Sequence, residues 1–167
     1  MSIFHRYRSE IHGNYRRAYL RSGLLTGLLL AAYILVRQLA GSPVERPFSL
    51  IVDAILLVAV FLLTAWYRAS LPDKRITLKE AMLFGIGTAV TAGVVYGLLL
   101  WIIGLVFPSQ TVLFNEILDV QQTAYPLKYW AAWWAILAGL ETILLGAFGA
   151  FIAAILFRNE KSEIKHK

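Results

Sequence analysis

The chain has 167 residues, of which 59% are hydrophobic and 16% are charged, and its mean hydropathy is +0.65. Soluble domains are apolar at roughly 45–50% of positions, so this composition excludes an ordinary soluble domain and indicates an integral membrane protein. The absence of cysteine excludes disulfides, covalently attached haem and thiolate metal sites. The 16 Lys and Arg flank apolar segments instead of forming a patch of their own, which favours anionic lipid over nucleic acid as their partner.

Four segments are long and apolar enough to form membrane-spanning helices, since a bilayer core requires about 20 helical residues. They are residues 20–39, 48–67, 81–107 and 130–157. Proline and glycine in the short connections "GSPVERP" and "LPDKR" cannot continue a helix, so neighbouring spans should be antiparallel. The sequence therefore predicts an all-α fold, a four-helix bundle that occupies residues 1–167 as a single membrane domain.

The distribution of basic residues predicts how the spans are oriented. All but three of the 16 Lys and Arg lie at the N-terminal end, between the second and third spans, or in the C-terminal tail; the exceptions are Arg37, Arg46 and Lys128. By the positive-inside rule both termini are cytoplasmic, which requires an even number of spans. A cleaved signal peptide is the competing interpretation of the first span. It is disfavoured because Arg37 closes the apolar run and no small-x-small cleavage site follows.

Two segments outside the spans have amphipathic patterns. In "MSIFHRYRSEIHGNYRRAYL" apolar residues recur at steps of three and four, which predicts an interfacial N-terminal helix. Its arginines would contact anionic lipid on the cytoplasmic side: Arg6, Arg8, Arg16 and Arg17. The alternative is a topology signal without a ligand. In the outer loop, "TVLFNEILDVQQ" predicts an amphipathic helix that covers the bundle, docks a partner or acts as a lid.

Small residues recur at steps of four within the spans. The pairs are Gly23 and Gly27, Gly93 and Gly97, and Gly146 and Ala150. Helices in lipid associate where small side chains let their backbones approach closely. We expect these pairs to serve packing within the bundle, with dimerisation as the alternative.

Charged residues inside the spans are the candidate functional groups. Arg37 and Asp53 lie near the outer ends of the first two spans, so antiparallel packing predicts an ion pair between them. Glu141 lies about 16 Å along the helix from Trp130, which places it near the middle of the bilayer. Thr91 and Tyr96 offer hydroxyl groups at comparable depth.

Two hypotheses follow for Glu141. In the first it is protonated and donates a hydrogen bond that fixes helix register. In the second it binds a proton, a cation or an amine during transport or energy coupling. Transport is disfavoured because no second acid accompanies Glu141 within the membrane and no pair of broken helices is evident.

The sequence does not indicate an enzyme. The histidines His5, His12 and His166 all lie in the tails, so the bundle contains neither a Ser–His–Asp arrangement nor a zinc site. "GIGTAV" lacks the final glycine and the preceding strand of a dinucleotide-binding motif. We expect no metal and no cofactor.

From the second span onward, the chain resembles a family of small bacterial membrane proteins catalogued as domain of unknown function 4199. The matching features are "ITLKEAMLFGIGTAV", "VFPSQ" and "LLGAFGAFIAAILFRNEK". The resemblance implies four transmembrane helices in a bacterial inner membrane and supplies no activity or catalytic residues. Glu141 does not map onto a motif of that family.

These observations together predict a non-catalytic accessory or structural subunit that packs against a larger membrane complex or against a second copy. One alternative is a small proton- or cation-coupled transporter that uses Glu141. Another is a membrane-organising protein that binds anionic lipid through its N-terminal tail.

Overall fold

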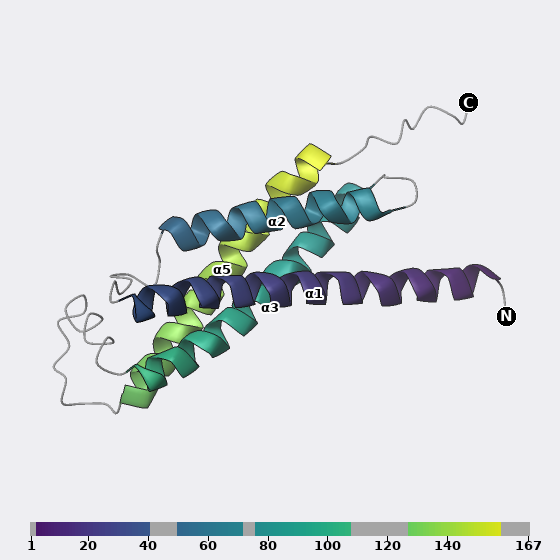
Figure 1. The fold of residues 1–167 in the computed structure, drawn as a ribbon. Coiled ribbons are helices and arrows are strands. Elements are labelled where there is room, and N and C mark those ends of the chain that lie inside the picture. Colours follow the sequence, from purple (N-terminus) through teal and green to yellow (C-terminus); the bar gives the residue numbers. More distant parts are fainter. Residues whose placement is uncertain (1–2, 41–49, 72–75, 108–126, 158–167) are drawn as a thin grey trace.

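The structure is a computed structural model that describes residues 3–40, 50–71, 76–107 and 127–157, with side chains described from residue 15 onward in the first range and from residue 131 onward in the last. These ranges form four helices (Figure 1). They are α1 (Ile3–Leu39), α2 (Leu50–Ser70), α3 (Leu78–Val106) and α5 (Leu127–Phe157).

Each helix contains a stretch long and apolar enough to cross a membrane: Tyr15–Leu39, Leu50–Ser70, Leu78–Val106 and Ala131–Phe157. This finding confirms the prediction of an all-helical fold with four helices of membrane-spanning length. Large aliphatic side chains cover the outside of the bundle; Leu25 and Leu144, for example, are 63% and 71% exposed. Such an apolar surface is unfavourable in water and suits contact with lipid.

The first helix differs from the sequence-based expectation. The N-terminal tail was predicted to form its own interfacial helix, whereas α1 runs without a break over 37 residues. Residues 3–20 contain no proline, and the single Gly13 costs only about 1 kcal/mol inside a helix, so nothing in this segment ends the helix before the apolar span begins.

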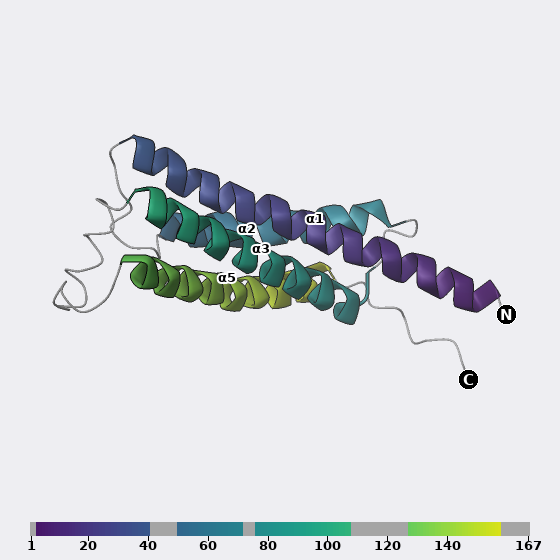
Figure 2. The same ribbon diagram turned by 90° about the horizontal axis from the view of Figure 1, so that it is seen from below.

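Consecutive helices are antiparallel, and α1 begins at the end of the bundle where α5 ends (Figure 2). α3 lies at the centre, with its most extensive packing against α5 and the next most extensive against α1. α2 packs mainly against α5 and comes close to α1 and α3 at few positions. The order of the helices around the bundle is therefore α1, α3, α5, α2.

Glycine allows close approach at the two largest interfaces. A Cβ atom added to Gly27 of α1 would lie 2.9 Å from the carbonyl oxygen of Ala92 on α3. One added to Gly97 of α3 would lie 2.8 Å from the carbonyl oxygen of Ala135 on α5. Further glycines at these interfaces are equally crowded: Gly23, Gly85, Gly93, Gly139 and Gly146, with Ala150 as the residue that a Cβ at Gly85 would meet. The predicted small-residue pairs thus lie at helix contacts within one chain, where backbones meet without intervening side chains.

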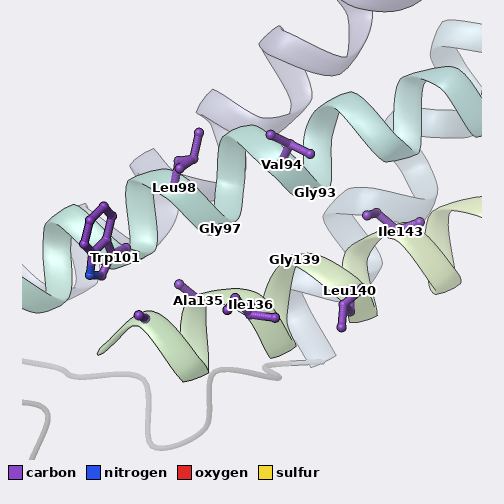
Figure 3. Close-up of a pocket in the computed structure, with 11 residues that line it drawn as sticks. Gly93, Val94, Gly97, Leu98, Trp101, Ala135, Ile136, Gly139, Leu140 and Ile143 are labelled. Carbon is purple, nitrogen blue, oxygen red and sulfur yellow. The ribbon is translucent and has the colours of Figure 1, made fainter. Parts of the chain in front are cut away.

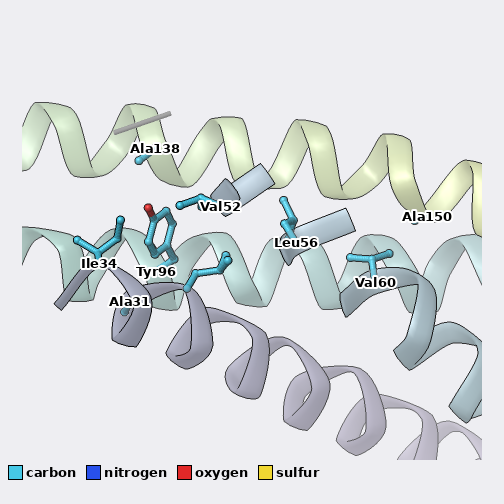
Figure 4. Packing of buried hydrophobic residues seen from close by; sticks show 9 residues of the cluster. Ala31, Ile34, Val52, Leu56, Val60, Tyr96, Ala138 and Ala150 are labelled. Carbon is cyan, nitrogen blue, oxygen red and sulfur yellow. The ribbon is translucent and has the colours of Figure 1, made fainter. Parts of the chain in front are cut away.

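The centre of the bundle is filled by side chains from all four helices (Figure 4). The largest contributions are aliphatic and come from α1 and α2, while α5 contributes alanine. The buried cluster comprises Leu30, Ala31, Ile34, Val52, Leu56, Val60, Tyr96, Ala138 and Ala150. Tyr96 is the only member of this cluster with a polar side-chain atom.

A capping box fixes the start of α3. The Thr77 hydroxyl accepts a hydrogen bond from the Glu80 backbone N–H at 3.2 Å, and the Glu80 carboxylate accepts one from the Thr77 backbone N–H at 3.0 Å. Both bonds satisfy donors that the first turn of a helix leaves free. The Tyr15 hydroxyl also donates to the Glu80 carbonyl oxygen at 3.1 Å, which ties α1 to the same turn.

Replacing the cap residue should weaken this end of the bundle. We expect Thr77→Ala to lower the free energy of unfolding by about 1 kcal/mol, because the Glu80 backbone N–H loses its acceptor. Thr77→Ser keeps the hydroxyl and serves as the control. Unfolding in detergent followed by circular dichroism measures both; equal stability of the two variants would contradict the role of the cap.

Candidate functional site

Glu141 lies near the middle of α5, at the edge of the buried face of that helix. Its neighbours at helical spacing, Ala138, Thr142 and Gly149, are buried, whereas Glu141 is half-buried. The Thr142 hydroxyl donates to the Ala138 carbonyl oxygen at 2.8 Å, back along its own helix. The Glu141 carboxyl therefore lies at the side of the bundle, between its interior and its outer surface.

The side chain of Tyr96 on α3 places a hydroxyl group inside the bundle, where it makes no hydrogen bond to the described residues. The residue is 1% exposed, and its hydroxyl oxygen has no hydrogen-bond partner among the described residues. Its ring reaches from α3 toward α5, with the hydroxyl end near Val52 and Ala138 (Figure 4). A buried hydroxyl without a partner is unfavourable by roughly 1–3 kcal/mol, so it marks a place where a ligand or a neighbouring group can bond.

Asp53 of α2 completes a group of three polar side chains, which we call the carboxyl–tyrosine cluster (Asp53, Tyr96, Glu141). The carboxyl groups of Asp53 and Glu141 are close enough to interact electrostatically, and each also interacts with the Tyr96 hydroxyl. The three residues lie at a similar depth along the long axis of the bundle. Counted from Ser70, Leu78 and Phe157 respectively, they are 17, 18 and 16 positions along their helices, or about 24–27 Å at 1.5 Å per residue.

This cluster corrects two points of the sequence analysis. Glu141 was expected to lack a second acid, and Asp53 was expected to pair with Arg37. The electrostatic partners that the structure gives Asp53 among the described residues are Glu141 and Tyr96. The Arg37 guanidinium donates to the Tyr33 hydroxyl of its own helix at 3.4 Å. The physical reason is the packing order, since α2 lies against α5 and comes close to α1 at few positions.

Thr91, the other hydroxyl predicted near Glu141, faces a different helix. Its hydroxyl donates to the Gly87 carbonyl oxygen at 2.8 Å, and its Cβ occupies the space beside Gly23 of α1. Of the polar group predicted from the sequence, the structure therefore brings Tyr96 to Glu141 and places Thr91 at the interface of α1 and α3.

The cluster offers side-chain oxygens and no backbone ligands. α2, α3 and α5 are unbroken helices at these positions, so their carbonyl groups are engaged in helical hydrogen bonds. In the described ranges there is no group of three or more His, Cys, Asp or Glu residues that could hold a metal ion. Two carboxyl groups and a phenol can share a proton, because a carboxylic acid and a phenol both donate to a carboxylate.

A second feature is an apolar groove of about 390 Å³ between α3 and α5 (Figure 3). Glycines form its floor, and larger side chains of α3 and α5 form its walls. The lining residues include Gly93, Gly97 and Gly139, with Val94, Trp101 and Ile136. The groove results from the small-residue contact between the two helices and contains none of the three residues of the carboxyl–tyrosine cluster.

The residues predicted to contact lipid are only partly described. Arg16 and Arg17 are exposed on α1. Arg6 and Arg8 belong to the same helix, but their side chains lie outside the described residues, as does the whole of the predicted outer-loop helix.

Comparison of the chain with protein-family models, with curated proteins and with solved structures finds no match in any of the three. The resemblance to domain of unknown function 4199 therefore stays a prediction, and the functional argument depends on the residues and geometry of the chain.

Proposed function

We propose that the chain is a multi-pass protein of the bacterial inner membrane with both termini in the cytoplasm. The first helix begins and the last helix ends at the same end of the bundle (Figure 2). Basic side chains of the described ranges gather toward that end: Arg16, Arg17, Arg21, Arg68 and Lys79, against Arg37 toward the other. This asymmetry supports a cytoplasmic location for the basic end.

We further propose that the protein binds and releases a proton or a small cation at the carboxyl–tyrosine cluster and couples this step to transport. The observation that carries the proposal is the second acid, Asp53, which interacts with Glu141 and with the unsatisfied Tyr96 hydroxyl. A lone protonated glutamic acid that fixes helix register needs one acceptor and no second acid. Two acids from different helices that interact electrostatically with one buried hydroxyl are expected at an ion or proton pathway.

The position of the cluster gives it access from the outer side. α2 has 21 residues, about 31 Å, which is close to the thickness of the hydrocarbon core. Asp53 lies three positions from the outer end of that helix, about 5 Å, so the cluster belongs to the outer part of the membrane and not to its middle, where Glu141 was expected from the sequence. A proton entering from outside therefore crosses little apolar material before it reaches Asp53.

The test is proton flux in liposomes that contain the purified protein. We expect Glu141→Gln to reduce the flux at least tenfold, because the amide cannot gain or lose a proton. Glu141→Asp retains a carboxyl group and should keep most of the flux. If wild-type protein supports no flux above empty liposomes, or if Glu141→Gln conducts as well as wild type, the proposal is wrong.

The second candidate function is a non-catalytic accessory subunit that packs against a larger membrane complex or against a second copy. The apolar groove between α3 and α5 favours it, because a groove with a glycine floor and apolar walls can accept large side chains of a partner helix. Purification from native membranes in mild detergent, followed by mass spectrometry, tests it: a stoichiometric larger partner supports this function, and a homogeneous small species rejects it.

A further inference from the structure

The apolar groove between α3 and α5 opens on the outer surface of the bundle. The side chains along its rims are more than half exposed: Val94, Leu98, Ile136 and Leu140. Among the described residues that line it, the indole N–H of Trp101 is the only polar side-chain group. A surface of this kind offers water almost no hydrogen bonds, so the expected occupant is hydrocarbon.

Direct contact between the two helices closes the floor of the groove (Figure 3). A Cβ atom added to Gly139 would lie 2.9 Å from the Gly93 carbonyl oxygen, and one added to Gly97 would lie 2.8 Å from the Ala135 carbonyl oxygen. Because these glycines already pack against the opposite helix of the same chain, they are not open to the backbone of a partner helix. What remains is a furrow of about 390 Å³ between two rows of side chains.

The size of the groove argues against a second copy as its occupant. A stable protein interface takes about 20–30 residues from each partner, whereas 11 residues line this groove. Its ends on α3 are marked by Gly93 and Trp101, which are eight positions or about 12 Å apart along the helix. One leaflet is about half of a hydrocarbon core of roughly 30 Å, so the groove matches a single acyl chain within one leaflet.

The depth of the groove identifies that leaflet. Tyr96 lies at the depth of Asp53, about 5 Å inside the outer end of α2. Trp101 lies five positions, or about 8 Å, nearer the outer end of the bundle than Tyr96, which places it at the outer membrane–water interface where tryptophan is enriched. A lipid whose chain follows the groove therefore has its head group beside Trp101 and the end of its chain near Gly93.

We propose that the groove between α3 and α5 binds one acyl chain of a phospholipid from the outer leaflet, more tightly than the lipids that surround the rest of the bundle. A chain in the groove contacts two helices and the floor between them, whereas a chain on a convex helix surface is contacted from one side. The inference rests on the proposed membrane location and orientation. It does not depend on proton transport, because the groove contains no residue of the carboxyl–tyrosine cluster.

The experiment counts the lipids that stay bound to the purified chain. Protein is reconstituted in vesicles of dioleoylphosphatidylcholine, extracted in mild detergent, washed free of surrounding lipid and examined by native mass spectrometry. The test variant, Val94→Phe/Ala132→Phe, fills the groove from two of its lining positions. The control variant, Val36→Phe/Ala32→Phe, adds the same side chains at exposed positions of α1 outside the groove. Circular dichroism checks that both variants are folded.

We expect one bound phospholipid per chain in the wild type and in the control variant. The test variant should retain about tenfold less, because the added rings occupy the space of the acyl chain. Wild-type protein in vesicles of diphytanoylphosphatidylcholine should also retain about tenfold less, because the methyl branches meet the rims of the groove. This second comparison needs no substitution, so it decides the question even if the test variant does not fold.

Retention should follow the acyl chain and not the head group, so dioleoylphosphatidylglycerol should be retained as well as dioleoylphosphatidylcholine. Equal retention by the test and control variants, or retention that follows the head group, would overturn the inference. A dimer that is present in wild type and lost in the test variant would also overturn it, because a second copy would then occupy the groove.

The same preparations separate this inference from the proposed proton-coupled function. Glu141→Gln should lose proton flux and keep its bound lipid; loss of the lipid would place the lipid site elsewhere. If wild-type protein retains the lipid but supports no flux, the lipid site stands and the transport proposal fails. If it supports flux but retains no lipid, transport stands and the lipid site is rejected.

Discussion

Tyr96→Ala is expected to destabilise the bundle by about 3–5 kcal/mol, the range for truncation of a buried aromatic side chain to alanine. Tyr96 is 1% exposed and packs within the cluster that joins all four helices, so its removal leaves a cavity at the centre of the molecule. Unfolding by a denaturing detergent, followed by circular dichroism, measures the loss.

Tyr96→Phe separates the packing of the ring from the chemistry of the hydroxyl. The phenyl ring fills the same volume, and the hydroxyl it removes has no partner among the described residues. We therefore expect the stability of Tyr96→Phe to equal or exceed that of wild type. Its proton flux should fall nonetheless, because the hydroxyl group that interacts electrostatically with Asp53 and Glu141 is gone. A loss of stability as large as that of Tyr96→Ala would show that the hydroxyl is bonded in the folded protein.

The four helices could be predicted from the sequence because their signal is local. A run of about 20 apolar residues is recognisable without knowledge of its neighbours, and each predicted span coincides with one helix. The separate N-terminal helix was predicted from a pattern that is also local, but a periodic pattern does not say where a helix ends. Without a proline or a cluster of turn residues, α1 simply continues.

The carboxyl–tyrosine cluster could not be predicted in full because it depends on which helices touch. From the sequence, Asp53 had an obvious partner in Arg37, which lies at a similar depth on the preceding span. The two helices that carry this pair approach each other closely at few positions, and α2 lies against α5 instead. One signal was present in the sequence: Asp53 and Glu141 are nearly equidistant from the C-terminal ends of their helices.

The small residues explain why α2 packs mainly against α5 and little against α1 and α3, the helices next to it in the chain. Glycine and alanine face each other along α3 and α5 and again along α1 and α3, and these contacts bring the three backbones together. α2 lacks glycine, so it cannot compete for such a contact and is left at the side of α5. Without glycine on α2, side chains such as Leu57 mediate its contact with α5.

Gly93→Val is expected to be the most damaging single substitution at the contact of α3 with α5. A Cβ atom at residue 93 would lie 2.6 Å from both the carbonyl oxygen of Gly139 and Cγ1 of Ile143, closer than such atoms approach in folded proteins. The Ile143 side chain can turn aside, but the carbonyl oxygen belongs to a helical backbone, so the two helices must separate. We expect a loss of about 3 kcal/mol, the upper end of the usual range for overpacking. Unfolding in detergent measures it.

Val94→Ile provides the matched control, because it adds one carbon to the next residue of the same helix, where the side chain is 52% exposed. We expect no measurable change in its stability. Equal losses of stability in Gly93→Val and Val94→Ile would show that the loss does not come from the close contact of α3 with α5.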